Sequence, residues 1–133
     1  MSHLLDVNLL VACGWRSHAD HQAARRWLDV QSRFFTCPLA QLGFLRVSIS
    51  PAFRATFEDA RGVLEELTRL KAARFVADGL PGTALPTLLS VNEVTDAYLV
   101  ALARASTLRL ATLDDALCHR PWARGIAVNP LKS

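Results

Sequence analysis

Short apolar segments alternate with segments of helical periodicity along this sequence, and that alternation leaves few folds open. The strand-like segments are apolar throughout rather than at every second residue, as in parallel strands that helices cover on both faces. They fall at 4–5, 34–37, 74–76, 108–111 and 126–128. Helical patterns separate them, at 7–13, 17–30, from Pro38 to a stop at Pro51, 56–72 and 90–105, with a helical turn at 115–118. The sequence therefore predicts an α/β fold, a three-layer α/β/α sandwich around a short parallel sheet.

Apolar spacing also predicts which helix faces are buried. The helix after Pro38 carries Leu39, Leu42, Leu45 and Ile49 on one face. We expect that face to pack against the core.

Length and cysteine usage limit the class of protein. The chain has 133 residues, 51% of them hydrophobic, which suits one packed domain over 1–133 and leaves little room for a second. Cys13, Cys37 and Cys118 contain no C-x-x-C pair, so neither a disulfide framework nor a zinc knuckle is indicated. No apolar segment approaches the roughly 20 residues that span a bilayer. We expect a cytoplasmic protein with no membrane anchor.

The charge balance leaves two interpretations open. The net charge is +3, and thirteen of the fifteen basic residues are arginine. A polyanionic partner such as nucleic acid would suit that balance. A scattered, solvated surface would suit it equally well, because no basic run exceeds Arg25-Arg26.

Two aspartates occupy matching positions after predicted inner strands. Asp6 directly follows Leu4 and Leu5, and Asp114 follows the segment 110–113. Ligand sites in parallel sheets form beyond the carboxyl ends of the strands. Each residue has an ordinary alternative role as the cap of the helix that follows.

A third aspartate lies on a helix that is apolar on every side. Asp96 shares a face of this helix with Leu99, Val100 and Ala103, so its carboxylate should be largely desolvated. A buried carboxylate must be protonated, matched to a cation or placed at the floor of a cleft; a hydrogen bond to a neighbouring loop is the structural alternative. The segment Ser90-Val91-Asn92-Glu93 has the form of a capping box, which would begin the helix at Ser90.

Convergence of Asp6, Asp96 and Asp114 would require a cation. Two carboxylates about 4 Å apart repel by about 4 kcal/mol at an effective dielectric near 20. Oxygen ligands favour Mg²⁺ or Mn²⁺ over zinc, and such an ion suits phosphodiester cleavage. His18 and His21 have no third ligand nearby in the sequence, so we interpret them as surface residues.

Four segments resemble the motifs of PIN-domain ribonucleases, specifically the VapC toxins of VapBC toxin–antitoxin systems. They cover almost the whole chain and occur in the family's order. They read Leu-Leu-Asp-Val-Asn-Leu-Leu at 4–10, Thr-Cys-Pro-Leu-Ala-Gln-Leu-Gly-Phe-Leu-Arg-Val at 36–47, Val-Thr-Asp-Ala-Tyr-Leu at 94–99 and Leu-Ala-Thr-Leu-Asp at 110–114.

The resemblance implies a function and partners. It implies Mg²⁺- or Mn²⁺-dependent endonucleolytic cleavage of structured RNA such as tRNA, with inhibition of translation. It also implies a VapB-type antitoxin that covers the acidic cleft, and a homodimer. Asp6, Asp96 and Asp114 match the family's metal-holding aspartates.

Five further residues are candidates for the expected site around those aspartates. Asn8, Thr112 and Asp115 are candidates for the surrounding shell, and Arg46 is a candidate contact to RNA phosphate, with a surface salt bridge as its alternative. Where the family commonly has a glutamate, this chain has Gln41, which can orient a metal-bound water but adds no negative charge.

The neutral residue at position 41 supports an alternative function. The chain would then be a catalytically degenerate PIN-like module that binds RNA or protein without turnover. Two other aspartate-using classes fit less well: a receiver domain would want a lysine after a late strand, and an aspartate-nucleophile phosphatase would want an aspartate at the position of Asn8.

Overall fold

The computed structural model describes residues 1–88 and 90–132, and its centre is a five-stranded sheet. All four strand pairs are parallel, in the order β3-β2-β1-β4-β5. The strands are β1 (His3–Leu5), β2 (Phe34–Thr36), β3 (Ala73–Phe75), β4 (Arg109–Ala111) and β5 (Ala127–Val128). The predicted α/β class and parallel sheet are confirmed, and each strand lies within about a residue of its predicted place.

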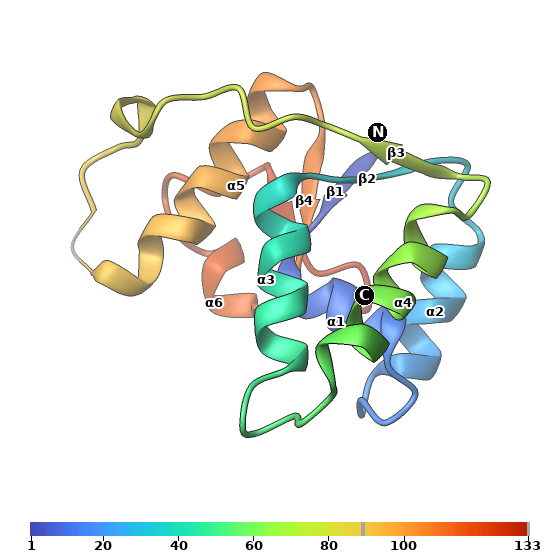
Figure 1. Cartoon of the computed structure of the whole chain (residues 1–133). Helices are drawn as coiled ribbons and strands as arrows, with labels where there is room; N and C mark the ends of the chain where they lie inside the picture. The colour runs from blue at the N-terminus through green and yellow to red at the C-terminus, as the bar shows by residue number, and fades with distance from the viewer. Residues whose placement is uncertain (89, 133) are drawn as a thin grey trace.

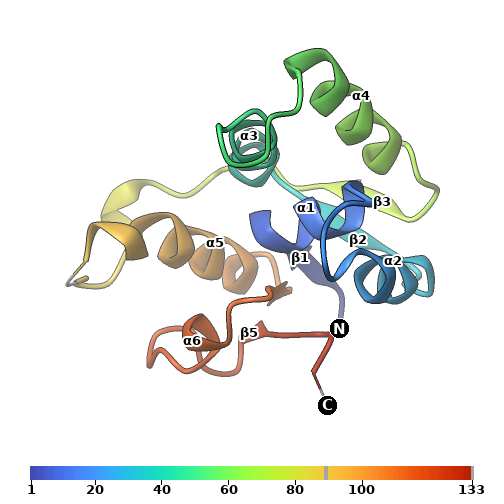
Figure 2. The same ribbon diagram turned by 90° about the horizontal axis from the view of Figure 1, so that it is seen from below.

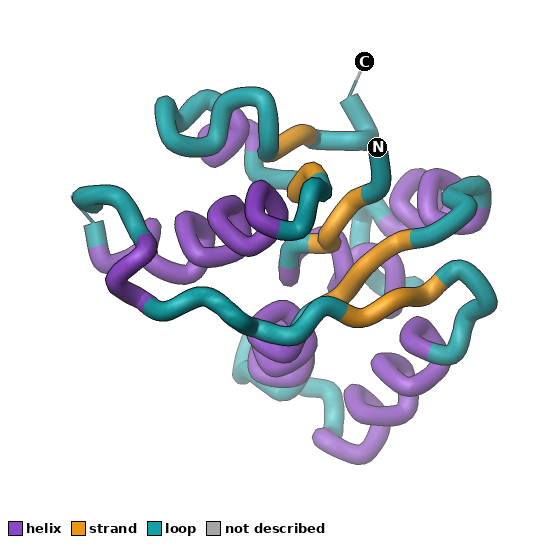
Figure 3. The backbone as a smooth tube through the Cα atoms, turned by 90° about the horizontal axis from the view of Figure 1, so that it is seen from above, coloured by secondary structure: helices purple, strands orange, loops and turns teal. Residues whose placement is uncertain are grey.

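In the described part of the chain, six α-helices surround the strands, which occupy the middle of the molecule (Figures 1 and 3). Helices α5 and α6 lie beside β4 and β5, and α4 lies beside β3 (Figure 2). None of the helices in the described part of the chain has the length and apolar character that a bilayer crossing requires. The helices are α1 (Val7–Gly14), α2 (His21–Asp29), α3 (Pro38–Ser48), α4 (Phe57–Thr68), α5 (Val94–Ala105) and α6 (Asp115–Cys118).

The strand order places a crevice between β1 and β4. From the central β1 the chain adds β2 and β3 on one side and then returns to add β4 and β5 on the other. Leu5 lies opposite Ala111, and the backbone N–H of Asp6 donates to the Ala111 carbonyl at 2.9 Å. The polar residues that follow the two strands therefore meet where the order reverses, the usual location of ligand sites in such sheets.

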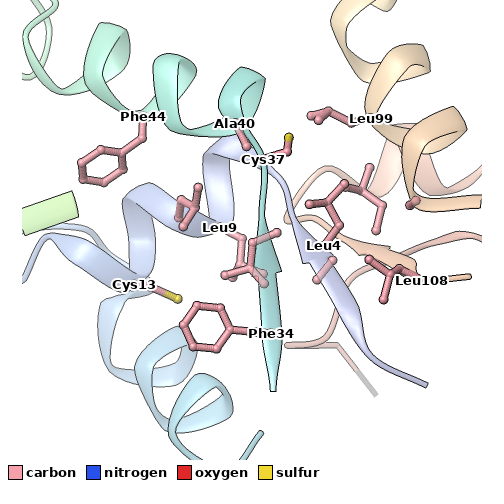
Figure 4. Packing of buried hydrophobic residues seen from close by; sticks show 14 of the residues in the cluster. Leu4, Leu9, Cys13, Phe34, Cys37, Ala40, Phe44, Leu99 and Leu108 are labelled. Carbon is pink, nitrogen blue, oxygen red and sulfur yellow. The ribbon is translucent and has the colours of Figure 1, made fainter. Parts of the chain in front are cut away.

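The core lies between β1, β2 and the helices packed on them. Leu4, Leu9, Phe34, Phe44 and Leu99 are fully or almost fully buried there (Figure 4). Two thiols share this environment, and burial raises the pKa of Cys13 to about 12 and that of Cys37 to about 11. Both stay protonated and unreactive at neutral pH.

Helix α3 buries only part of the face that the leucine spacing predicts, because Leu39 and Leu45 are partly buried against the core and the other two residues are exposed. Leu42 is 57% exposed and Ile49 44% exposed, whereas Phe44 is buried. The reason is a close approach to α1, because a Cβ on Gly43 would lie 2.4 Å from a methyl carbon of Val7. Gly43 lets the two helices touch and turns the neighbouring Phe44 into the core, a preference that apolar spacing does not reveal.

Three helix ends also differ from the sequence prediction. Helix α2 begins at His21 rather than at residue 17, because 15–20 form turns. Helix α4 ends at Thr68, whose hydroxyl donates to the Leu64 carbonyl at 3.0 Å, rather than at residue 72. Helix α5 begins at Val94, after a 3-10 turn over Val91–Glu93.

Thr107, two residues beyond the end of α5, has a backbone conformation that suits glycine. Its φ is 58°, and the backbone N–H groups of Thr107 and Leu108 donate to the carbonyls of Arg104 and Ala103 at 3.2 and 2.8 Å, as in a Schellman motif. A β-branched residue is strained there. We expect Thr107→Gly to raise the free energy of unfolding by about 0.5–1 kcal/mol, measured by urea unfolding. Thr107→Ala is the control and should gain less, since it keeps a Cβ at positive φ.

Candidate functional site

Asp6 anchors the site at the carboxyl end of β1. Its side chain is almost fully buried, at 4% exposure. One carboxylate oxygen accepts from the Val7 backbone N–H at 2.7 Å, and the other accepts from the Thr112 hydroxyl at 2.7 Å. Burial raises the pKa of Asp6, while these two hydrogen bonds oppose the rise and the nearby charge of Asp114 adds to it. Asp6 thus caps α1 and also contributes a buried carboxylate to the crevice.

The Thr112 hydroxyl links the residues that follow β1 and β4. Besides donating to Asp6, it accepts from the Asp114 backbone N–H at 3.1 Å and from the Asn8 side-chain amide at 3.2 Å. The Asn8 amide oxygen accepts in turn from the Leu113 backbone N–H at 3.0 Å. Asn8 and Thr112 therefore hold the two strand ends together and orient Asp6.

Asp96 faces the crevice from the first turn of α5. It is half-buried, and its pKa is raised to about 6. Burial is the largest cause, followed by the negative charges of Asp6 and Asp114; Glu93 adds to the rise and Arg120 opposes it. At neutral pH Asp96 is a charged carboxylate in a strongly negative surrounding.

Asp114 is the exposed member of the three. It caps α6, with one carboxylate oxygen accepting from the Leu117 backbone N–H at 3.2 Å. Asp6 and Asp114 both cap the helices that follow them, as the sequence allowed. Among the described residues no hydrogen bond engages the second carboxylate oxygen of Asp114.

Two pockets meet at Asp96. One, with a volume of about 470 Å³, is lined by Asp6, Asp96 and the apolar side chains of α1 and α3. The other, of about 200 Å³, is lined by Asp96, Asp114 and Arg120. Asp96 therefore stands between the other two aspartates.

The donor chemistry of this cleft suits a hard divalent cation. Carboxylate oxygens from three elements, mutually repelling, are the ligands that Mg²⁺ and Mn²⁺ take. Among residues 1–88 and 90–132, however, no group of three or more His, Cys, Asp or Glu side chains is arranged to hold a metal ion. Asp6, Asp96 and Asp114 influence one another electrostatically, but within the described residues their side chains are not already arranged as a three-ligand group. A metal shared by these aspartates therefore stays a proposal.

Within the described residues, the side chains of three other candidates form no hydrogen bond or salt bridge with Asp6, Asp96 or Asp114. The Gln41 side-chain amide donates to the Thr36 hydroxyl at the end of β2, at 3.0 Å. Asp115 pairs with Lys132 and accepts from the Asn129 amide at 3.1 Å, and these hydrogen bonds lower its pKa. Arg46 is exposed on α3, and within the described residues it forms no salt bridge. Asp115 thus faces the C-terminal segment rather than the crevice.

The capping box predicted at the start of α5 is wrong. The Ser90 hydroxyl accepts from the Asn92 backbone N–H at 3.2 Å rather than from that of Glu93, and it caps a 3-10 turn. The Glu93 carboxylate instead lies 3.8 Å from the Arg120 guanidinium, on the rim of the cleft.

The sequence pattern does not indicate two residues that line the larger pocket. His18 and Phe53 line it together with Asp6 and Asp96, although His18 was interpreted as a surface residue. His21, interpreted in the same way, is half-buried, with its Nδ1 at 2.8 Å from the Ala12 carbonyl oxygen. No motif marks these positions, since turns and loops bring them to the pocket.

Comparison with known proteins adds independent findings. A family model described as PIN domain matches residues 3–123. Ribonuclease VapC38 of Mycobacterium tuberculosis is 41% identical over 118 residues, covering 84% of each chain, and Ribonuclease VapC29 of the same species is 35% identical, covering 90% of each. The crystal structure of M. tuberculosis VapC20, described as a Sarcin-Ricin loop cleaving toxin, matches with a TM-score of 0.64 at 14% identity, covering 88% of this chain and 92% of that one.

Proposed function

This chain belongs to the PIN-domain family, among the VapC ribonucleases, and on that premise we propose that it is a Mg²⁺- or Mn²⁺-dependent endoribonuclease toxin. Its substrate is structured RNA such as tRNA, and its cleavage inhibits translation. The family relation supports the nuclease activity itself. The metal is proposed from the carboxylates of the cleft, whereas the substrate class and the effect on translation are what the resemblance to VapC toxins implies.

The observation that carries the proposal is the electrostatic state of Asp96. Its pKa of about 6 reflects burial together with the negative charges of Asp6 and Asp114. A fold retains mutually repelling carboxylates at a topological switch point at a cost in stability. A cation held among them removes that cost and is the simplest reason for their placement.

Asp6, Asp96 and Asp114 would hold the ion. When bound, it would supply a water of lowered pKa and stabilise negative charge on the phosphate and on the departing oxygen. The protein supplies orientation: Thr112 and Val7 fix the Asp6 carboxylate, and the capping bond to Leu117 fixes Asp114. Arg120, on the rim, lies where it can balance phosphate charge.

Gln41 favours a second candidate function. A neutral side chain that donates to Thr36 adds no charge to the cleft, so a module that binds RNA without turnover is the alternative.

Cleavage of RNA separates the two functions. Purified protein is incubated with total RNA and end-labelled tRNA in EDTA, and then with Mg²⁺ or Mn²⁺ in excess. We expect cleavage only with the divalent ion, and none by an Asp6→Asn variant purified identically. RNA binding without cleavage under either ion would identify the module, and cleavage that persists in EDTA would remove the metal from the mechanism.

We expect Arg120, on the rim of the cleft, and Arg46, exposed on α3, to hold the RNA backbone, so affinity should fall as salt rises. We expect the logarithm of the association constant to fall linearly with the logarithm of salt concentration, by roughly 0.7 per phosphate contact for single-stranded RNA. Arg46→Gln and Arg120→Gln should each flatten that slope by about one contact. Arg109→Gln, at the opposite end of β4, is the matched control. Fluorescence anisotropy with a labelled RNA in EDTA measures the slope, and a slope independent of salt would contradict the arginine contacts.

Protein partners belong to the same proposal. A VapB-type antitoxin would cover the acidic cleft, and a homodimer would form through exposed apolar surface. The large exposed apolar residues include Leu42 and Val47 on α3, Ile49 directly after it, and Val91 and Val94 near the start of α5. The three free cysteines agree with a reducing cytoplasm, where RNA substrates are present.

A further inference from the structure

The larger pocket, of about 470 Å³, also has apolar lining residues, which cannot bind a cation. Besides Asp6 and Asp96 it is lined by Val11, Val47 and Phe53, with His18 as a further polar group. Resting on the proposed RNA cleavage, we propose that this pocket binds one unstacked nucleobase beside the scissile phosphate, with Phe53 as the stacking surface and His18 as the hydrogen-bond donor. The pocket would then contribute to the choice of the cleaved nucleotide.

Phe53 is held in place for this role. The loop after α3 is closed by backbone hydrogen bonds from Phe53 and Arg54 to the Ser50 carbonyl, at 3.0 and 2.7 Å. Arg54 has a φ of 66°, an uncommon conformation for a residue with a side chain. The ring of Phe53 packs at a tilt on Trp15, with centroids 5.3 Å apart. A ring fixed in this way offers a stacking surface at little entropic cost.

Trp15 is itself held in place by a hydrogen bond and by an aromatic contact. Its indole N–H donates to the Ser48 hydroxyl at 2.9 Å, and the buried Ser48 donates in turn to the Phe44 carbonyl at 2.7 Å. The indole lies almost parallel to the Phe44 ring, at an interplanar angle of 5°. The aromatic side of the pocket is therefore anchored in the hydrophobic core.

His18 presents a hydrogen-bond donor. Its Nδ1 accepts from the Asp20 backbone N–H at 3.0 Å, so in the neutral ring the hydrogen is on Nε2. Base edges carry carbonyl and ring-nitrogen acceptors that such a donor can bind. The turn at 18–20 thus fixes both the position of the ring and its tautomer.

The charges in the pocket select a neutral occupant. A phosphate placed inside would face the carboxylates of Asp6 and Asp96, whereas a nucleobase carries no charge and has an apolar face. The volume of about 470 Å³ lies within the range of small-ligand sites. The pocket shares Asp6 and Asp96 with the cleft. When a phosphate of the RNA lies at these aspartates, the base of the adjacent nucleotide can therefore enter the pocket.

Nucleosides test the base site without metal and without catalysis. In EDTA, the four common ribonucleosides and ribose are titrated into the intact protein while the His18 imidazole and Trp15 indole resonances are followed by NMR. At least one nucleoside should bind at least about tenfold more tightly than ribose, because stacking of a base on an aromatic ring contributes about that factor or more. Both resonances should shift with it.

Matched variants assign the binding to the two side chains. Phe53→Leu keeps apolar volume but removes the aromatic face, and His18→Ala removes the donor; each should weaken the preferred nucleoside severalfold or more. Phe57→Leu and His119→Ala change an exposed aromatic on α4 and the histidine that follows α6, and neither should alter binding. The thermal midpoint of each variant identifies any that fails to fold.

Three outcomes overturn the base site: all nucleosides bind no better than ribose, Phe53→Leu binds as the parent does, or the control variants lose as much as the pocket variants. In the first case an apolar side chain of a protein partner is the better occupant. These results are separate from the nuclease activity, because RNA cleavage with no nucleoside preference would refute the base site alone. A nucleoside preference without RNA cleavage would refute the nuclease and retain the pocket.

Discussion

Replacing Asp96 with asparagine should reduce metal-dependent RNA cleavage by at least about a thousandfold. Asparagine keeps the size and an oxygen donor but removes the negative charge that holds the ion, whose stabilisation of the transition state amounts to several kcal/mol. Initial rates on end-labelled RNA with excess Mn²⁺ measure the loss. Asp59→Asn, on the exposed first turn of α4, is the control and should cleave at the parent rate.

The same variant should be more stable than the parent at pH 7.5. The pKa of Asp96 is about 6 in the folded chain, against an ordinary value of 3.8, so the folded state binds the proton more tightly than the unfolded state. The parent therefore loses stability as pH rises through about 6, and this loss is absent below about pH 4. Solvent screening at a half-buried site reduces the effect, and we expect Asp96→Asn to gain about 1 kcal/mol at pH 7.5.

Urea unfolding of both proteins from pH 4 to pH 7.5, in EDTA, measures that gain. The difference should grow with pH and vanish at the acidic end. Asp59→Asn should change stability in the opposite direction, by a few tenths of a kcal/mol, because it removes a favourable charge from a helix N-terminus. An Asp96→Asn variant that is less stable at every pH would mean that Asp96 is a structural residue rather than a repelled ligand.

Replacing Thr112 with valine should impair both folding and cleavage. The residue is fully buried, and its hydroxyl donates to Asp6 and accepts from the Asp114 backbone N–H. Valine leaves a buried carboxylate oxygen and a backbone N–H without partners, which costs about 2–3 kcal/mol. Because the carboxylate of Asp6 also loses its orienting contact, we expect cleavage to fall roughly 10–100-fold, the usual effect of losing a residue that positions a metal ligand.

The Thr112→Ser variant distinguishes the contribution of the hydroxyl group from that of the methyl group. It keeps the donor to Asp6 and should retain most of the cleavage, with a stability loss of about 1 kcal/mol from the missing methyl group. The loss in Thr112→Val should be larger at pH 7.5 than at pH 4, because the Thr112 hydrogen bond lowers the pKa of Asp6 and stabilises its charged form. Equal cleavage by the valine and serine variants would exclude the proposed role of the hydroxyl.

The parts of the fold set by local pattern were predictable from the sequence. Apolar segments buried on both faces predict the parallel strands, and the polar residues directly after them predict the crevice edge, where the structure places Asp6 and Thr112. The partial burial of Asp96 was also predictable, because the residues that follow it on the helix, 97–103, are apolar and a carboxylate beside them has few satisfactory environments. Each of these inferences uses only the pattern of residues that are close to one another in the sequence.

The features that depend on tertiary contact were not predictable. The buried face of α3 follows from the contact of Gly43 with Val7, which no spacing along α3 encodes. Asp115 faces Lys132 and Asn129 because of where the C-terminal segment packs. His18 and Phe53 reach the pocket from a turn and a loop, whose paths depend on long-range packing rather than on periodicity.

Binding of Mn²⁺ to the aspartates tests the central claim most directly. The thermal midpoint is measured for the parent and for Asp96→Asn as Mn²⁺ is added to metal-free protein, since a ligand that binds only the folded state stabilises it, by about 2.7 kcal/mol at a hundred times its dissociation constant. The parent midpoint should rise steadily with Mn²⁺, and that of Asp96→Asn should rise far less. A parent midpoint that does not move, or an equal rise in both proteins, would contradict a cation site formed by these carboxylates.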